Sequence, residues 1–237
     1  MKLFKNLRQY FIEKKDIKRY VLYAIGEIFL VMVGISLAFQ VDNWNEERIK
    51  RSNEIGYYRN IRDQILDDQE LIKSQIKYNN RYASQFTYAF DIIEANDKSK
   101  MDTLGIIIRN MTQYSDFDRE GNIYESLVNS GEIKILKNNH IVRGIRELEE
   151  RYIYVNRIES IHYDAMMNHT VTAINPIIKF STAEIKRQEL VFNYEFQNLF
   201  VVLLQIMKEK DEVYHNALNQ IDLIKKLIDE ELESSSN

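Results

Sequence analysis

A single acidic residue interrupts the most apolar stretch of the sequence. Glu27 lies within "YAIGEIFLVMVGISLAF", residues 23–39. A carboxyl group can carry a proton, form an ion pair or accept hydrogen bonds. Because such a group is costly to place against lipid, it is expected to face a protein neighbour or water. Glu27 is therefore the first candidate for chemistry in the chain.

Three interpretations of Glu27 are open from the sequence. In the first, a neutral carboxyl hydrogen-bonds to a symmetry mate or extends toward the cytoplasmic side. In the second, Glu27 forms a salt bridge with a Lys or Arg in the span of a partner. In the third, it relays protons or ions, as in energy-coupled membrane complexes, although a likeness of architecture does not establish function.

Small residues share the helix face of Glu27. At 100° per residue, Val31, Gly34 and Ala38 all lie within about 40° of Glu27 around a helix. Small residues four positions apart allow two helix backbones to approach closely in lipid. The sequence thus predicts a helix-packing or polar site made of Glu27, Val31, Gly34 and Ala38.

A second group of candidate residues contains two histidines and an acid. Glu159, His162 and His169 occur on one predicted helix. Since seven helical residues rise about 10.5 Å, both imidazoles are too far apart to bind one ion directly. We expect them to line or flank the core of a bundle and to hold no metal.

The remaining chemistry is sparse. There is no cysteine, and neither a glycine-rich phosphate loop nor a G-x-S-x-G or H-E-x-x-H motif occurs. The acidic clusters Asp67-Asp68 and Glu147, Glu149 and Glu150 are expected to be solvated helix surface. We therefore expect no enzymatic activity and no cofactor, and the sequence identifies no small-molecule substrate.

Composition favours an all-α fold. Only seven Gly and one Pro occur in 237 residues, too few for the turns of a β-sandwich or barrel. Basic residues concentrate near the N-terminus, where residues 1–41 carry seven Lys and Arg against three acids, and the rest of the chain is acidic. With no basic stripe there, nucleic-acid binding is not expected.

Residues 21–41 have the length of a membrane span. Twenty-one helical residues extend roughly 30 Å, the thickness of the hydrocarbon core of a bilayer. Tyr20, Tyr23 and Trp44 occupy the positions of interfacial anchors. Two alternatives are a cleaved signal peptide, with a small-x-small site at Ser36 and Ala38, and the buried core helix of a soluble protein.

The flanking charges predict an orientation. Basic residues precede the span, whereas acids nearly balance them after it. The positive-inside rule then places the N-terminus in the cytoplasm and, in a cell inner membrane, the C-terminal domain in the periplasm. Residues 1–20 are expected to form a basic amphipathic helix on the inner leaflet.

Helical periodicity continues beyond the span. The pattern predicts a long helix at 46–95 continuing from the span, shorter ones at 103–114 and in "IYESLVNS", and further long helices at 138–175 and 193–233. "STAEIK" is an approximate capping box. Long helices with short breaks predict an antiparallel bundle with coiled-coil packing. The expected domains are a head at 1–20, a span at 21–43, a bundle at 44–233 and a tail at 234–237.

The head of the sequence resembles an uncharacterised family of membrane-anchored proteins abundant in Bacteroidota. The family pairs a Y-A-x-G-E-I-x-L-V-x-x-G-I-x-x-A segment with W-N-E, and "YAIGEIFLVMVGISLA" and "WNE" match it here. "YESLVNSGEIKILKNN" and "NYEFQNLF" are similar to further blocks, whereas Phe39 and Asp42 depart from the expected Leu and Asn. The resemblance implies a domain of unknown function and supplies no activity.

These observations predict a non-enzymatic, single-span scaffold or interaction module. It is expected to contact the lipid bilayer and to form a homo-oligomer or to bind another membrane or periplasmic protein. The alternative is an accessory subunit of an ion- or proton-coupled inner-membrane complex in which Glu27 carries protons.

Overall fold

The computed structural model describes residues 17–119 and 121–234. Most of the expected amphipathic head, residues 1–16, and the last three residues of the tail lie outside the described residues. So do the side chains of Tyr20 and Tyr23, two of the predicted interfacial anchors, although their backbone belongs to the first helix.

The part of the chain that the structure describes is all-α apart from one short hairpin, as composition predicted. The chain divides into two compact units, Met1–Asn53 and Glu54–Asn237. The first helix, α2 (Ile17–Glu94), contributes to both units. The prediction of a long helix through residues 46–95 that continues from the apolar stretch is therefore confirmed.

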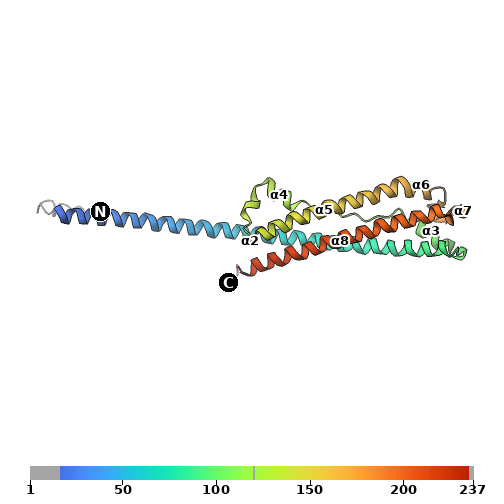
Figure 1. The fold of residues 1–237 in the computed structure, drawn as a ribbon, viewed down its shortest axis with the longest axis horizontal. Coiled ribbons are helices and arrows are strands. Elements are labelled where there is room, and N and C mark those ends of the chain that lie inside the picture. Colours follow the sequence, from blue (N-terminus) through green and yellow to red (C-terminus); the bar gives the residue numbers. More distant parts are fainter. Residues whose placement is uncertain (1–16, 120, 235–237) are drawn as a thin grey trace. The chain divides into compact units, whose positions relative to one another are not determined.

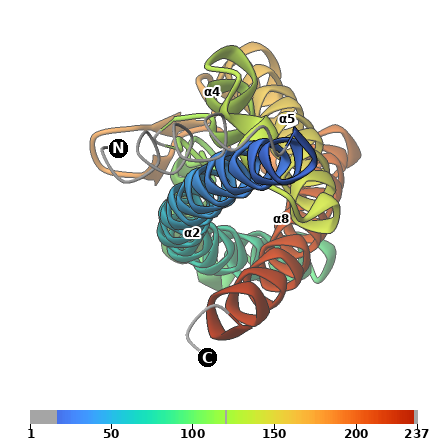
Figure 2. The same ribbon diagram turned by 90° about the vertical axis from the view of Figure 1, so that its left-hand side faces the viewer.

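Three helix segments form the bundle of the second unit. They are residues 54–94 of α2, α5 (Asn139–Ala165) and α8 (Tyr194–Ser234). Figure 1 shows these segments side by side, with α8 running opposite to α2 and α5. The view along the bundle in Figure 2 shows α5 and α8 beside this part of α2 around a common interior.

Short elements close the two ends of the bundle. At one end lie η1 (Lys98–Lys100), α3 (Met101–Asn110), a hairpin of β1 (Ile178–Lys179) and β2 (Glu184–Ile185), and α7 (Gln188–Val191). At the other end lie α4 (Ile123–Asn129) and η2 (Glu132–Ile135). Gly131 follows the "IYESLVNS" stretch and precedes η2 with φ 74°, a left-handed conformation that is common at the ends of helices.

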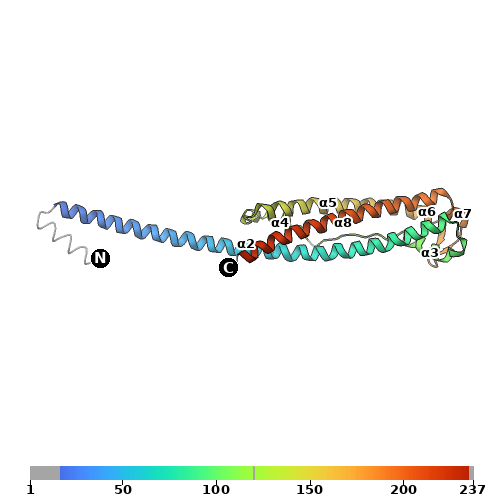
Figure 3. The same ribbon diagram turned by 60° about the horizontal axis from the view of Figure 1, so that its bottom comes forward.

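A non-helical segment connects these two ends. Residues 113–119, which we call the crossing segment, run along the bundle between α3 and α4 (Figure 3). The predicted helix at 103–114 was thus too long, because α3 ends at Asn110. Ser115 and Phe117 are buried while Asp116 and Asp118 are exposed, an alternation that an extended chain produces and a helix does not.

The core has two parts along the bundle. The first contains 20 buried residues from residues 54–72 of α2, the crossing segment, the chain from α4 to η2, α5 and the C-terminal half of α8. The second contains 16 buried residues from the end of α2, α3, the hairpin region and the start of α8. The core includes most residues of the apolar stripes. Among them are Tyr58, Ile65 and Ile72 on α2 and Ile221 and Ile224 on α8 in the first part, and Phe200 on α8 in the second.

Two local features differ from prediction. "STAEIK" is not a helix cap, because Glu184 and Ile185 pair with Lys179 and Ile178 in the hairpin. Its turn includes Ala183 at φ 58°, and the Ala183 carbonyl oxygen approaches Gly105 so closely that a Cβ there would lie 2.0 Å away. A glycine on α3 therefore makes room for the hairpin turn.

The predicted helix at 138–175 also contains an irregular turn. After α5, residues Met166–Thr170 form a π-helical turn, and α6 (Val171–Ile174) follows before Pro176. The Thr170 hydroxyl donates to the Ala165 carbonyl oxygen at 3.3 Å, five residues back. A π turn shifts the faces of the helix that follows it and is frequent near functional sites.

Candidate functional site

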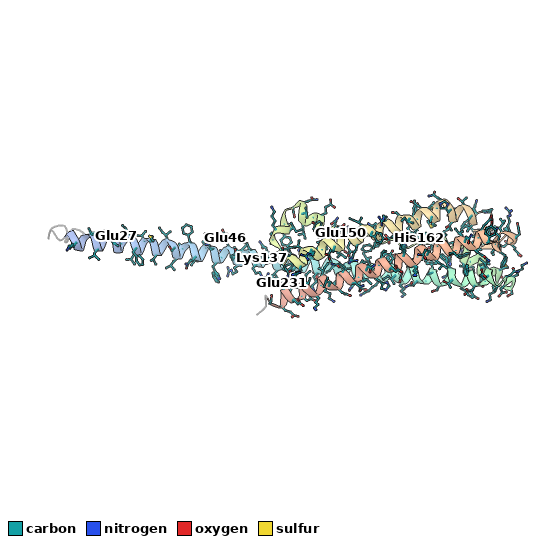
Figure 4. The ribbon with its side chains drawn as sticks, in the orientation of Figure 1. Glu27, Glu46, Lys137, Glu150, His162 and Glu231 are labelled. Carbon is teal, nitrogen blue, oxygen red and sulfur yellow. The ribbon has the colours of Figure 1, made fainter. Side chains whose placement is uncertain are left out.

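The predicted packing face lies in the first unit, on a helix with exposed side chains. Val31 is 57 % exposed, Gly34 and Ala38 are exposed, and Glu27 is half-buried. A Cβ added at Gly34 would meet no atom within 4 Å. Figure 4 marks Glu27 and Glu46 on this helix.

The same helix contains a candidate membrane span. Within Ala24–Glu94, one 18-residue window is long and apolar enough to cross a membrane, and none of it is buried. Trp44, the third predicted anchor, is 68 % exposed, and the guanidinium carbon of Arg48 lies 5.8 Å from its ring centroid.

In the bundle, three buried acids each accept a hydrogen bond from a tyrosine hydroxyl. The pairs are Glu54 with Tyr58, Asp68 with Tyr152, and Glu159 with Tyr214. All three acids are at most 4 % exposed, and the tyrosines are among the largest fully buried side chains of the described residues. The tyrosine hydroxyl supplies the donor that a buried carboxylate requires.

The first pair fixes the start of α5. Glu54 Oε1 accepts from the Tyr58 hydroxyl at 2.8 Å and from the backbone N–H of Lys137 at 2.7 Å. The Tyr58 oxygen accepts in turn from the N–H of Asn138 at 3.2 Å. Asn138 caps α5, because its side chain accepts from two backbone N–H groups of the first turn.

The second pair contradicts one prediction. Asp68 was expected to be solvated, yet it is 3 % exposed and accepts from Tyr152 at 2.9 Å. Arg119 lies 4.7 Å from the centroid of the Tyr152 ring and donates from both terminal nitrogens to Glu149, at 2.7 and 2.5 Å. Glu149 was also expected to be solvated, but its side chain is only 12 % exposed.

The third pair lies at the centre of a larger polar group. Glu159 Oε1 accepts from the Tyr214 hydroxyl and from the backbone N–H of Phe117 at 2.8 Å. Lys210 Nζ donates to the Ser115 carbonyl oxygen at 2.5 Å and lies 3.3 Å from Nδ1 of His162. Two atoms of this group, Glu159 Oε2 and His162 Nε2, are buried without a hydrogen-bond partner among the described residues.

Burial dominates the electrostatics of this polar group. It raises the pKa of Glu159 and lowers the pKa of Lys210 to about 8. Burial, and then the charge of Lys210, lowers the pKa of His162 to about 3. His162 is therefore neutral at pH 7, whereas the Lys210 ammonium remains mostly protonated, because Glu159 and Asp116 partly offset its desolvation.

The crossing segment explains why these polar groups are buried. An extended segment cannot satisfy its backbone N–H and C=O groups internally, so other groups must do so. Here the side chains of Glu159, Lys210 and Gln75 bind the backbone of Phe117, Ser115 and Asp116, respectively. Together they come from all three long helices.

Figure 4 marks His162 on α5, beside α8 within the bundle. His162 is fully buried, as predicted for a core residue, but His169 is exposed and lines a cavity of about 570 Å³ near the π turn. No cluster of three His, Cys, Asp or Glu side chains suited to a metal occurs in residues 17–119 and 121–234. The two histidines therefore belong to different environments.

Two cavities adjoin the buried acids. The larger, about 1030 Å³, is lined by α2 and the chain from Asp118 to Leu127, and Asp68 belongs to its lining. The other, about 670 Å³, lies between the crossing segment and α5, and Glu159 belongs to its lining. Asp118 lines both cavities.

Sequence reasoning missed Lys210 and the hydrogen bonds of Tyr214, and it extended a helix into the crossing segment. Asp68 and Asn79 interrupt the apolar stripe of α2 at helical spacing, and this signal is informative because both are buried. Lys210 falls between Met207 and Tyr214 on the buried stripe of α8 in the same way. An interruption of an apolar stripe could therefore have found Lys210, but not the groups that it contacts.

Comparison with known proteins identifies a family but no described relative. A family model described as "Family of unknown function (DUF6090)" matches residues 27–208, which include the Glu27 face and most of the bundle. No curated protein and no solved structure matches the chain. The chain belongs to the family of unknown function DUF6090.

Proposed function

We propose that this chain is a non-enzymatic, single-span membrane protein whose helical bundle binds or scaffolds another protein. One observation carries the proposal: the apolar window of α2 is entirely unburied in a chain whose other long helices bury their apolar stripes. Water does not favour 18 such residues in a row, and a bilayer does.

The proposed location is a cell inner membrane, with the N-terminus in the cytoplasm and the bundle in the periplasm. The excess of Lys and Arg before the span supports this orientation. Ser234→Cys tests it, because the chain has no cysteine of its own. A membrane-impermeant maleimide added to intact spheroplasts should label this variant, and labelling only after lysis would reverse the orientation.

Self-association is proposed along Glu27, Val31, Gly34 and Ala38. The absence of any atom within 4 Å of a Cβ at Gly34 supports close approach of a second span there. Gly34→Leu should reduce cross-linked dimers in membranes several-fold. Gly26→Leu, at an equally open glycine about 80° away around the helix, is the matched control.

The geometry of the polar group supports a non-enzymatic role. Among the basic side chains described in the bundle, Lys210 and His162 have pKa values that are lowered furthest from their usual range, and both side chains are fully buried. Their contacts are with the protein itself, including the Ser115 carbonyl oxygen. Such an arrangement suits a structural network better than attack on a substrate.

The alternative function, proton or ion transfer through Glu27, is separable by substitution. Glu27→Gln keeps a hydrogen-bonding side chain but cannot exchange a proton, whereas Glu27→Leu removes both properties. Association that survives Gln and fails with Leu would support the packing role. Loss of a cellular phenotype with Gln, while dimers persist, would favour proton transfer.

A partner is best identified directly. Affinity purification of the full chain from membranes in mild detergent, followed by mass spectrometry, should recover a membrane or periplasmic protein at near-stoichiometric yield. Recovery of the chain alone, as a dimer that Gly34→Leu disrupts, would restrict the function to self-association. A monomer without a partner would contradict the proposal.

A further inference from the structure

The cavity beside Glu159 is strongly acidic. Its volume is about 670 Å³, and the residues that line it come from the crossing segment and α5. Its acidic members are Asp116, Asp118, Glu159 and Asp164, and its aromatic members are Tyr114, Phe117 and Tyr163. The described residues of this lining include no Lys or Arg. We call this space the acidic cavity.

Glu159 differs from the other acids of the cavity because it is buried. It is 4 % exposed, whereas Asp116, Asp118 and Asp164 are exposed. Its Oε1 is fully used by the Phe117 N–H and the Tyr214 hydroxyl, but its Oε2 has no partner among the described residues. A buried carboxylate oxygen without a donor is costly, so a donor that enters the cavity is stabilised there.

The aromatic members of the cavity also favour a cation. The ring centroids of Tyr114 and Tyr163 are 5.3 Å apart, with the rings inclined at 63°. A cation within about 6 Å of such a ring is attracted by its π-electrons. Lys210 Nζ already lies 6.0 Å from the Tyr114 centroid. Even with Lys210 protonated, its single charge is outnumbered by the three exposed carboxylates of the acidic cavity, Asp116, Asp118 and Asp164.

We propose that the acidic cavity binds the ammonium group of an aliphatic primary amine. Glu159 Oε2 accepts one N–H hydrogen bond, the tyrosine rings contact the ammonium and its first methylene groups, and the exposed carboxylates attract the charge. This site belongs to the bundle, so it is independent of the association proposed for the apolar helix.

The observations favour an amine over two other cations. A metal ion needs several ligands on one centre, and the described residues contain no group of three suitable side chains. A quaternary ammonium has no N–H to offer to Glu159 Oε2. A primary amine provides the charge, up to three donors and an apolar chain.

Calorimetric titration of the full chain in detergent tests the proposal. The probe is 1,4-diaminobutane at pH 7 and fixed ionic strength, and tetramethylammonium and Mg²⁺ chlorides serve as comparison cations. We expect saturable binding of one diamine per chain. Tetramethylammonium should bind about tenfold more weakly or worse, because it forms no charge-assisted hydrogen bond.

Substitutions locate the site. Glu159→Gln keeps an oxygen that accepts from Phe117 and Tyr214 but replaces the unpaired Oε2, and it should lower diamine affinity about tenfold. Asp164→Asn, at an exposed position, should lower it two- to threefold. Asp91→Asn removes an exposed charge elsewhere on α2 and should leave affinity unchanged.

Three results would overturn the proposal. These are the absence of saturable diamine binding, equal binding of tetramethylammonium, and an equal loss of affinity in Asp91→Asn, which would indicate unspecific charge attraction. Tighter binding of Mg²⁺ than of the diamine would assign the site to a metal instead. If Glu159→Gln does not fold by circular dichroism, Asp164→Asn and Tyr163→Leu decide, and unchanged affinity in both rejects the site.

Discussion

Apolar side chains are exposed on the apolar helix of the first unit and buried in the bundle. Leu30 in the first unit is 63 % exposed, and the same holds broadly for its neighbours between residues 21 and 41. In the second unit, side chains of similar type such as Ile65 and Phe200 are fully buried. The difference teaches that helical periodicity alone does not supply burial. A stripe is buried only where other helices of the same chain pack against it.

Acidic residues differ between these regions too. In the bundle, Glu159 and Asp68 accept hydrogen bonds from tyrosines on other long helices, 55 and 84 residues away in sequence. Glu27 lies on the apolar helix of the first unit, where it is half-buried and most of its neighbours are exposed. The acids of the bundle are thus buried by contacts between distant parts of the chain, whereas Glu27 lies on a helix whose side chains are mostly exposed.

The largest effect should follow from removing a buried ring. Phe200 is fully buried, with its ring centroid 6.1 Å from that of Phe86 and 5.5 Å from that of Phe196. Phe200→Ala should lower the free energy of unfolding by roughly 3–5 kcal/mol. Leu30→Ala is the control and should change it by less than about 0.5 kcal/mol. Urea denaturation in detergent measures both, and equal effects would break the comparison.

Breaking a charged pair in the bundle should lower the stability of the protein more than breaking one in the first unit. Arg119→Met leaves the largely buried Glu149 without its bidentate partner and should cost roughly 3 kcal/mol. Lys50→Met removes the partner of Glu46, but these side chains are 57 % and 61 % exposed. No measurable change in melting temperature is expected for Lys50→Met. A comparable loss of stability in both variants would contradict the burial of the Arg119–Glu149 pair.

Protonation should destabilise the bundle as the pH falls. Because the pKa of His162 is lowered to about 3, the unfolded chain binds a proton below pH 6.5 before the folded chain does. Stability from this residue is therefore lost between pH 6.5 and 3, by about 2 kcal/mol on going from pH 7 to pH 5. Lys210, Glu159, Asp116 and Tyr114 also surround this position.

The His162 contribution is isolated by comparing variants. Between pH 7 and pH 5, His162→Gln should lose about 2 kcal/mol less stability than the unmodified chain, since glutamine does not titrate. His215→Gln, at a histidine whose side chain is 55 % exposed, should keep the original pH response. Identical pH responses in the original chain and His162→Gln would show that His162 is not buried as described.

A smaller effect is expected at the start of α5. Asn138 Oδ1 accepts from the N–H of His140 at 2.9 Å and from that of Ile141 at 3.4 Å. Asn138→Ala should lower the free energy of unfolding by about 1 kcal/mol. Asn219→Ala, at an exposed position inside α8, should have no destabilising effect. An equal or larger loss of unfolding free energy in Asn219→Ala would contradict the assignment of the effect to the Asn138 cap.

Much of the fold was predictable, because helical periodicity depends on residues that are close together in the sequence. Ile61, Ile65 and Ile72 recur at helical spacing and indicated the buried face of α2 before any contact was known. The crossing segment was not predictable in the same way. "QYSDFDR" reads as a polar break. Its extended form depends on hydrogen bonds that its backbone donates to Gln75 and Glu159 and accepts from Lys210, which lie 41, 42 and 95 residues away in sequence.

The sequence by itself determined that long helices form, that residues 21–41 are too apolar and too long for an ordinary surface helix, and that Glu27 shares a face with Gly34 and Ala38. These properties follow from residue type and helical period, which act over one or two turns. Only the tertiary structure decided that Asp68 and Lys210 are buried and that Glu159 borders a cavity. The physical reason is that a polar side chain is buried only where a donor or acceptor meets it, and here those partners come from distant parts of the chain.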